Sequence, residues 1–170
     1  MFQIVNILER HRDTGVMFGQ DGSLHELEQG IGAMVFAGVN VLAIVLAAAA
    51  SFLFGGAWYS GLGKPWQDAL GKTDAEIKGR NMTVAMVVTV ICQLVMAWVL
   101  AGLIGHLGPG QVTLKNGLIS AGFVWVGFVL APLIVNHAFQ GQKHMLTLID
   151  AGHWLGVLLI QGAVIGLLGV

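Results

Sequence analysis

Four long stretches of the chain contain almost no charged side chains, and their length limits the fold more than any motif does. No Lys, Arg, Asp or Glu occurs from Gln29 to Gly63, from Asn81 to Leu114 or from Asn116 to Gln142. The last stretch, His144 to Val170, carries one acid, Asp150. A helix of about 20 mostly apolar residues crosses the hydrocarbon core of a bilayer. The sequence therefore predicts an integral membrane protein, an all-α bundle of four membrane-spanning helices.

The composition agrees with a bilayer environment. Hydrophobic residues make up 56% of the 170 residues and charged residues 10%, whereas soluble domains are about one quarter charged. The net charge of −1 offers no basic patch, so nucleic acid is excluded as an expected partner. The expected partner is the lipid bilayer itself. The single cysteine, Cys92, lies in the second apolar stretch and cannot form an intrachain disulfide.

We expect two parts in the chain, a polar N-terminal tail at residues 1–30 and a membrane domain at residues 31–170. The spans are expected at about residues 31–59, 82–104, 114–138 and 144–168. Two other interpretations stay open at the N-terminus. One is a shorter chain that begins at Met17 or Met34, and the other is a signal peptide cleaved after Ala48-Ala49-Ala50.

Proline and capping residues mark the connection after the first span. Pro65 to Leu70 predicts one short interfacial helix, anchored at the membrane surface by Trp66. Thr73 and Glu76 have the spacing of a capping box, which predicts the start of another helix. We expect that helix to run through Arg80 into the second span.

Other residues shape the third and fourth spans. Thr113 is the expected N-cap of the third span. Pro132 predicts a kink in it near the carbonyl of Phe128, because proline cannot donate the usual helical hydrogen bond. The short link from Phe139 to Lys143 makes the third and fourth spans an antiparallel hairpin.

The charges of the connections predict the orientation. Successive spans alternate in direction, so the connections after the first and third spans share one side of the membrane. That side carries five basic residues: Lys64, Lys72, Lys78, Arg80 and Lys143. The other side carries Lys115 alone near a span end. By the positive-inside rule, the two basic connections face the cytoplasm, and both termini lie outside the inner membrane.

Small residues recur at steps of four along the spans and predict faces of close packing. The stripes are Ala43, Ala47, Ser51 and Gly55; Ala85, Thr89, Gln93, Ala97, Ala101 and Gly105; Gly152 with Gly156; and Gly162 with Gly166. Lipid supplies no hydrophobic force between helices, so packing depends on such residues. We expect the stripes to be buried inside one bundle, and a homo-oligomer formed through one stripe is the alternative. Gln93 and Gln161 are expected to hydrogen-bond across helices.

Asp150 is the most informative polar residue. A charged aspartate at mid-helix costs about 2.5–3.5 kcal/mol on insertion scales, so we expect it to face inward or to have a partner. His153 follows three residues later and lies on the same helix face. Other polar and aromatic residues come to the same cytoplasmic end. The predicted ligand or proton pocket consists of Asp150, His153, His137, Asn136, Trp58, Tyr59 and Asn81.

Several interpretations of this cluster stay open. It is a structural hydrogen-bond network, a pocket that binds or passes a small ligand or a proton, or a metal site. In the last case His137, Asp150 and His153 supply two imidazoles and a carboxylate. We favour a non-enzymatic membrane protein with such a pocket. The alternatives are a membrane-embedded metal protein or enzyme and a structural subunit of a larger membrane complex.

No cofactor, resident metal or catalytic residue is predicted. The sequence contains no nucleotide-binding loop, zinc-protease motif or nucleophile elbow.

Two segments resemble a bacterial membrane family called domain of unknown function 1761. One is Trp58-Tyr59-Ser60 at the end of the first span, followed by Lys64-Pro65-Trp66. The other is the hairpin from Phe139 to Lys143, followed by Leu148 to Gly152. The resemblance covers about Val35 to Val170 and leaves out the acidic tail. It implies a small four-helix membrane protein with no assigned activity, and it supplies no catalytic residues.

Overall fold

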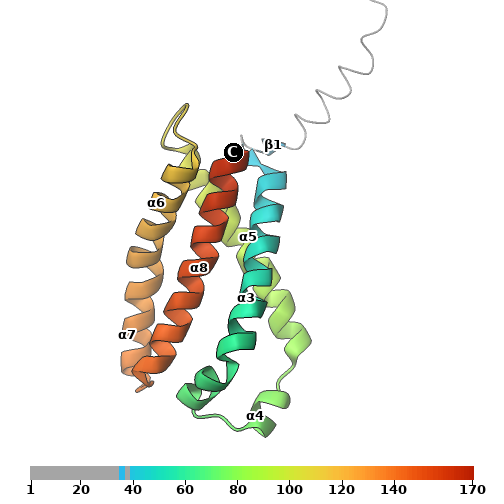
Figure 1. The fold of residues 1–170 in the computed structure, drawn as a ribbon, viewed down its shortest axis with the longest axis vertical. Coiled ribbons are helices and arrows are strands. Elements are labelled where there is room, and N and C mark those ends of the chain that lie inside the picture. The colour runs from blue at the N-terminus through green and yellow to red at the C-terminus, as the bar shows by residue number, and fades with distance from the viewer. Residues whose placement is uncertain (1–34, 37–38) are drawn as a thin grey trace, which may run out of the picture. The chain divides into compact units, whose positions relative to one another are not determined.

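The computed structural model describes residues 35–36 and 39–170, and that part of the chain forms a bundle of long helices (Figure 1). Three are continuous: α3 (Val41–Leu70), α5 (Met82–Gly105) and α8 (His144–Leu168). The other long helix consists of α6 (Leu114–Val124), the π-helix η1 (Trp125–Leu130) and α7 (Ala131–Phe139).

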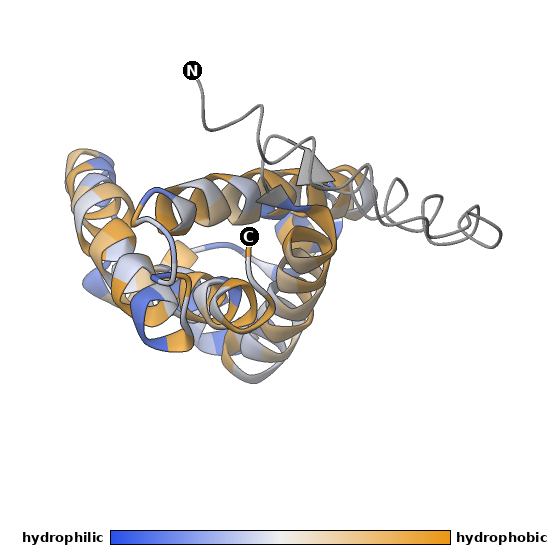
Figure 2. Cartoon of the chain, turned by 90° about the horizontal axis from the view of Figure 1, so that it is seen from above, coloured by the Kyte–Doolittle hydropathy of each residue, from blue (hydrophilic) through white to orange (hydrophobic). Residues whose placement is uncertain are grey.

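The four long helices have the length and apolar composition of membrane spans, so the predicted all-α four-helix membrane bundle is confirmed. Hydrophobic residues occupy much of the circumference of each helix, not one face alone (Figure 2). This distribution is expected where lipid rather than water covers the outside. The predicted polar tail, residues 1–30, lies outside the described residues.

A short strand pair precedes the first long helix, and its last residue contacts the end of the last helix. Strands β1 (Val35–Phe36) and β2 (Val39–Asn40) pair antiparallel directly before α3. Asn40 caps α3, because its side-chain oxygen accepts a hydrogen bond from the Ala43 amide at 3.1 Å. The Asn40 side-chain nitrogen also donates to the Leu168 carbonyl at 3.3 Å, which ties the start of α3 to the end of α8.

Helix α8 packs most extensively against α3 and α6, and glycines allow the close approach to α6. A Cβ atom on Gly117 would overlap the Gly162 carbonyl oxygen, and one on Gly166 would overlap the Thr113 carbonyl oxygen. The backbones of α6 and α8 are therefore in direct contact. This gives extensive van der Waals packing, which stabilises helix pairs in lipid, where no hydrophobic force acts between them.

The predicted small-residue stripes are buried to different extents. Ala43, Ala47, Ser51 and Gly55 of α3 are all buried. On α5 the stripe is buried at Gln93, Ala97 and Ala101, half-buried at Thr89 and Gly105, and exposed at Ala85. The first half of α5 thus diverges from its neighbours within the described bundle.

A buried polar network links three helices at the centre of the bundle. The Ser51 hydroxyl donates to the Gln93 side-chain oxygen at 2.7 Å. The Gln161 amide nitrogen donates to the Ser51 hydroxyl and to the Gln93 backbone carbonyl, both at 3.1 Å. The predicted bonding of Gln93 and Gln161 across helices is therefore confirmed, with Ser51 as the bridge between α3, α5 and α8.

The prediction of a separate helix at Pro65–Leu70 is wrong, because these residues form the last turns of α3. Proline removes the hydrogen bond that residue 65 would donate to the Gly61 carbonyl. Gly61 is exposed, and water at a membrane surface can bond the freed carbonyl, so the helix tolerates the proline. The helix ends at Gly71, whose φ of 68° lies in the left-handed region.

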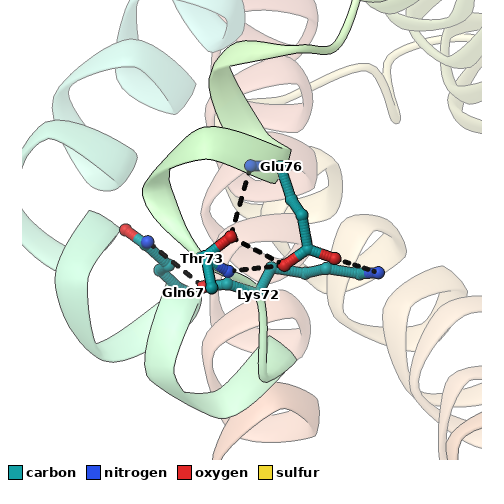
Figure 3. A network of polar contacts seen from close by, with 4 residues as sticks. All are labelled: Gln67, Lys72, Thr73 and Glu76. Atoms are coloured by element: carbon teal, nitrogen blue, oxygen red, sulfur yellow. Dashed lines mark hydrogen bonds and ion pairs between the residues drawn. The ribbon is translucent and has the colours of Figure 1, made fainter.

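The short helix in this connection is α4 (Asp74–Lys78), and the predicted capping box at its start is confirmed. The Glu76 carboxylate accepts from the Thr73 amide at 2.8 Å and from the Lys72 ammonium at 3.2 Å (Figure 3). The expectation that this helix continues through Arg80 is wrong. Helix α4 ends at Lys78, and Asn81 starts α5 as a new N-cap.

Near Phe128, where Pro132 predicts a kink, the structure has the π-helix η1. The amide of Ala131, the residue that follows η1, donates to the Val126 carbonyl five residues earlier. Pro132 follows directly, and its missing amide is accommodated at this junction. Thr113 caps α6 as expected, because its side chain accepts from the Asn116 amide.

We predict that Gly117→Ala destabilises the bundle by about 1–3 kcal/mol, because the added methyl forces α6 away from α8. Gly122→Ala on the same helix is the matched control. Within the described structure, a Cβ on Gly122 meets no atom within 4 Å. Unfolding of both variants in mixed detergent–SDS micelles, followed by circular dichroism, measures the difference. Equal stability of the two variants would contradict the close backbone contact.

The capping box at Glu76 makes the stability of α4 depend on pH. Hydrogen bonds from the Thr73 backbone and hydroxyl, then from Lys72, lower the pKa of Glu76 from 4.5 to about 2. Because the folded pKa is depressed, the stabilisation of α4 is complete above pH 4.5 and is lost as the pH falls toward 2. NMR titration of the Glu76 side-chain carbon in micelles measures this directly. Thr73→Ala should return the titration toward the ordinary value, and a wild-type midpoint near 4.5 would refute the assignment.

Candidate functional site

Asp150 lies in the second turn of α8 and receives two hydrogen bonds from α3. Its Oδ1 atom accepts from the Tyr59 hydroxyl at 3.1 Å and from the Trp66 indole Nε1 at 3.1 Å. Tyr59 and Trp66 are seven residues apart, about two helical turns, so they share one face of α3. This arrangement requires α3 to remain helical through Pro65, which lies between them.

The second oxygen of Asp150 faces α7. The distance from Asp150 Oδ2 to His137 Nε2 is 4.0 Å, which is longer than a hydrogen bond. The other ring nitrogen of His137 lies 2.9 Å from the Thr147 hydroxyl on α8. Oδ2 is therefore without a hydrogen-bond donor among the described residues. The Asp150 side chain keeps 19% of its surface exposed and that of His137 keeps 12%.

No lysine or arginine of the described chain pairs with Asp150. Lys143, at the start of α8, instead donates to the Asp68 backbone carbonyl at 2.7 Å. Lys64 pairs with the Asp68 carboxylate at 3.8 Å. Both cations thus lie at the end of α3, and Asp150 has only two neutral donors and an imidazole beside it.

His153 lies one turn further along α8 and is 5% exposed. Its ring packs among aromatic side chains, with centroid distances of 6.2 Å to Phe54, 4.9 Å to Tyr59 and 5.0 Å to Trp154. The ring nitrogen Nε2 lies against Gly55, where a Cβ atom would come within 2.9 Å of it. The other nitrogen, Nδ1, has no partner in the described part of the molecule.

Trp58 packs over the neighbouring turn of α8. A Cβ atom on Gly152 would lie 3.0 Å from its ring, and the ring centroid is 5.5 Å from that of Phe54. The indole N–H is buried and, like His153 Nδ1, finds no acceptor among residues 35–36 and 39–170. Buried polar groups are normally bonded, and these two atoms are exceptions among the described residues, as is the side-chain oxygen of Gln161.

Two of the predicted site residues lie apart from Asp150. Asn136 is exposed, because one residue along a helix is a rotation of about 100° and its neighbour His137 faces α8. Asn81 caps α5, with its side chain accepting from the Val84 amide at 3.1 Å. Neither makes a hydrogen bond to Asp150.

Two residues of the site, Trp66 and Thr147, lie outside the set predicted from the sequence. The sequence predicts Trp66 as an interfacial anchor, on a separate helix that begins at Pro65. Its seven-residue spacing from Tyr59 was the available signal. Thr147 precedes Asp150 by three residues, so its place on the same face of α8 was also readable.

The alternative metal site has no support from the described residues, among which no three His, Cys, Asp or Glu side chains gather closely enough to hold an ion. An open groove of about 590 Å³ lies between α5 and α6. It includes Gln111 and Asn116 but none of the predicted site residues. The hydrogen-bonded cluster at Asp150, not this groove, is therefore the candidate site.

Comparison with known proteins adds the family and no activity. No curated protein matches the chain, and no solved structure matches it either. Residues 42–166 match the family model described as "Protein of unknown function (DUF1761)". That segment contains all four long helices except their outermost residues, together with Tyr59, Trp66, His137 and Asp150. The chain therefore belongs to the DUF1761 family.

Proposed function

We propose that this protein is a non-enzymatic inner-membrane protein in which Asp150 binds and releases a proton at the cytoplasmic end of the bundle. The observation that carries the proposal is the unequal environment of the two carboxylate oxygens. Oδ1 accepts two hydrogen bonds, whereas Oδ2 has no donor within hydrogen-bond distance in the described chain and lies 4.0 Å from His137. A proton on Oδ2 leaves the Tyr59 and Trp66 bonds intact.

The geometry favours a proton-binding role over a purely structural one. A carboxylate kept for structure alone would have both oxygens bonded, since an unmet polar atom near hydrocarbon is costly. Asp150 instead keeps one oxygen open and part of its surface exposed. Ionisable residues placed inside membrane bundles commonly mark proton or ion sites.

The proposed orientation rests on the positive-inside rule. Asp150 follows the basic connection between α7 and α8 and receives its bonds from the end of α3 that precedes Lys72 and Lys78. If these connections face the cytoplasm, the proton exchanges with the cytoplasm and both chain termini lie on the outer side.

We predict that Asp150→Asn folds normally and loses one pH-dependent transition. The amide oxygen of asparagine still accepts from Tyr59 and Trp66, so the free energy of unfolding should change by less than about 1 kcal/mol. Asp150→Ala removes the acceptor of both donors and should cost about 1–3 kcal/mol. Tryptophan fluorescence of the detergent-purified protein, recorded across pH, follows the transition because Trp66 contacts the carboxylate.

Asp68→Asn is the matched control, because this exposed carboxylate lies at the same end of the bundle without contacting the site. Infrared difference spectra give an independent readout, the carbonyl band of the protonated acid. The band present in the wild type and in Asp68→Asn should be missing in Asp150→Asn. If all three proteins give the same pH response, or if Asp150→Asn fails to fold, the carboxylate has a structural role instead.

A further inference from the structure

We propose that the Asp150 site also binds a small organic ammonium ion, which competes with the proton for Asp150 Oδ2. This inference rests on the proposed function, because the ammonium ion takes the place that the proton occupies. It adds the chemical class of a ligand to a site that otherwise binds hydrogen ions.

The carboxylate of Asp150 lacks a basic side chain beside it in the described chain. When Asp150 loses its proton, no lysine or arginine of the described chain stands beside it to balance the negative charge. Tyr59 and Trp66 from α3 donate to it, and His137 from α7 lies 4.0 Å from it. The other titratable group nearby is His153 from α8, whose ring packs against Tyr59. A buried or half-buried charge is normally paired, so a ligand cation is the natural counter-charge at the open oxygen.

The second argument is the aromatic wall beside the carboxylate. Tyr59 and Trp66 both reach Asp150 Oδ1, and their rings meet edge-on with centroids 5.6 Å apart. The His153 ring lies 4.9 Å from that of Tyr59. Tryptophan and tyrosine faces attract cations within about 6 Å of the ring centre, and ammonium ligands are recognised in this way.

The third argument is the pair of unmet polar atoms further inside the cluster. His153 is 5% exposed, and its Nδ1 and the Trp58 indole N–H have no partner within the described bundle. Trp58 can only donate and a neutral imidazole can donate or accept, so a polar group on the ligand can bond either atom. These atoms favour an ammonium ion that carries a hydroxyl or similar group over a purely hydrocarbon cation.

The same residues argue against an inorganic cation. Calcium takes six to eight oxygen ligands, and magnesium takes six in octahedral geometry, several of them waters. The site offers one carboxylate and one phenol, and the described chain has no cluster of three metal-binding side chains. An organic ammonium ion needs fewer ligands, and one carboxylate with aromatic rings nearby is sufficient for it.

The test uses the full chain in detergent, with choline as the probe and 3,3-dimethylbutan-1-ol as its uncharged isostere. Isothermal titration calorimetry should detect choline but not the alcohol. As the pH is lowered through the range in which Asp150 takes up its proton, choline affinity should fall by up to tenfold per pH unit, because the proton and choline exclude each other. Asp150→Asn should abolish binding.

Trp66→Phe should weaken choline binding by up to about tenfold, because tryptophan attracts a cation more strongly than phenylalanine does. Trp98→Phe is the matched control, because Trp98 lies exposed on α5 and should leave the affinity unchanged. Sodium chloride at equal ionic strength should not displace choline.

The outcomes separate the two proposals. If the Asp150-dependent pH transition is present but choline does not bind, or binds no better than the alcohol, the ammonium site is refuted and the proton site stands. Choline binding that survives Asp150→Asn, or that sodium displaces equally well, also refutes it. If Asp150→Asn leaves the pH response unchanged, the proton site itself is refuted, whatever choline does.

Discussion

Close packing of α8 at glycines, against the backbone of α6 and the side chains of α3, is the constraint on which the rest of the structure depends. A bilayer does not press helices together as water does, so these helices associate through close fit and a few hydrogen bonds. Gly117 and Gly162 bring α6 against α8, and Gly55 makes room for His153 between α3 and α8. Because α8 is fixed on both sides, Asp150 is held opposite Tyr59 and Trp66, and Gln161 is held opposite Ser51.

The fold was largely readable from the sequence because the bilayer sets both the length and the composition of its helices. Local signals were also sufficient where a cap depends on neighbouring residues, as at Thr73 with Glu76 and at Thr113. The prediction of a separate helix from Pro65 is wrong, because it relied on the tendency of proline to break a helix. Tertiary bonds from Trp66 to Asp150 accompany a continuous helix there, and such bonds have no local signature.

The candidate site was readable in part, for a similar reason. Asp150 stood out because a charge within an apolar stretch is costly, and the structure places Tyr59 and His137, which the sequence groups with it, beside this carboxylate. Asn136 and Asn81 were included because they share the same end of the bundle, yet depth in the membrane does not fix the direction of a side chain. Helical phase decides that direction, and the phase of α7 depends on the π-helical turn before it.

That π-helical turn has a consequence for how α7 is aimed. A π-turn takes up one residue more than an α-turn, so η1 acts as an inserted residue that offsets everything after it by about 100° around the helix axis. His137 contacts Thr147 of α8 with this offset in place, and a regular α-helix over the same stretch would rotate the imidazole by about 100° away from that contact. Asp150, which has no arginine partner in the described chain, thus has an imidazole neighbour because the helical pitch changes locally before α7.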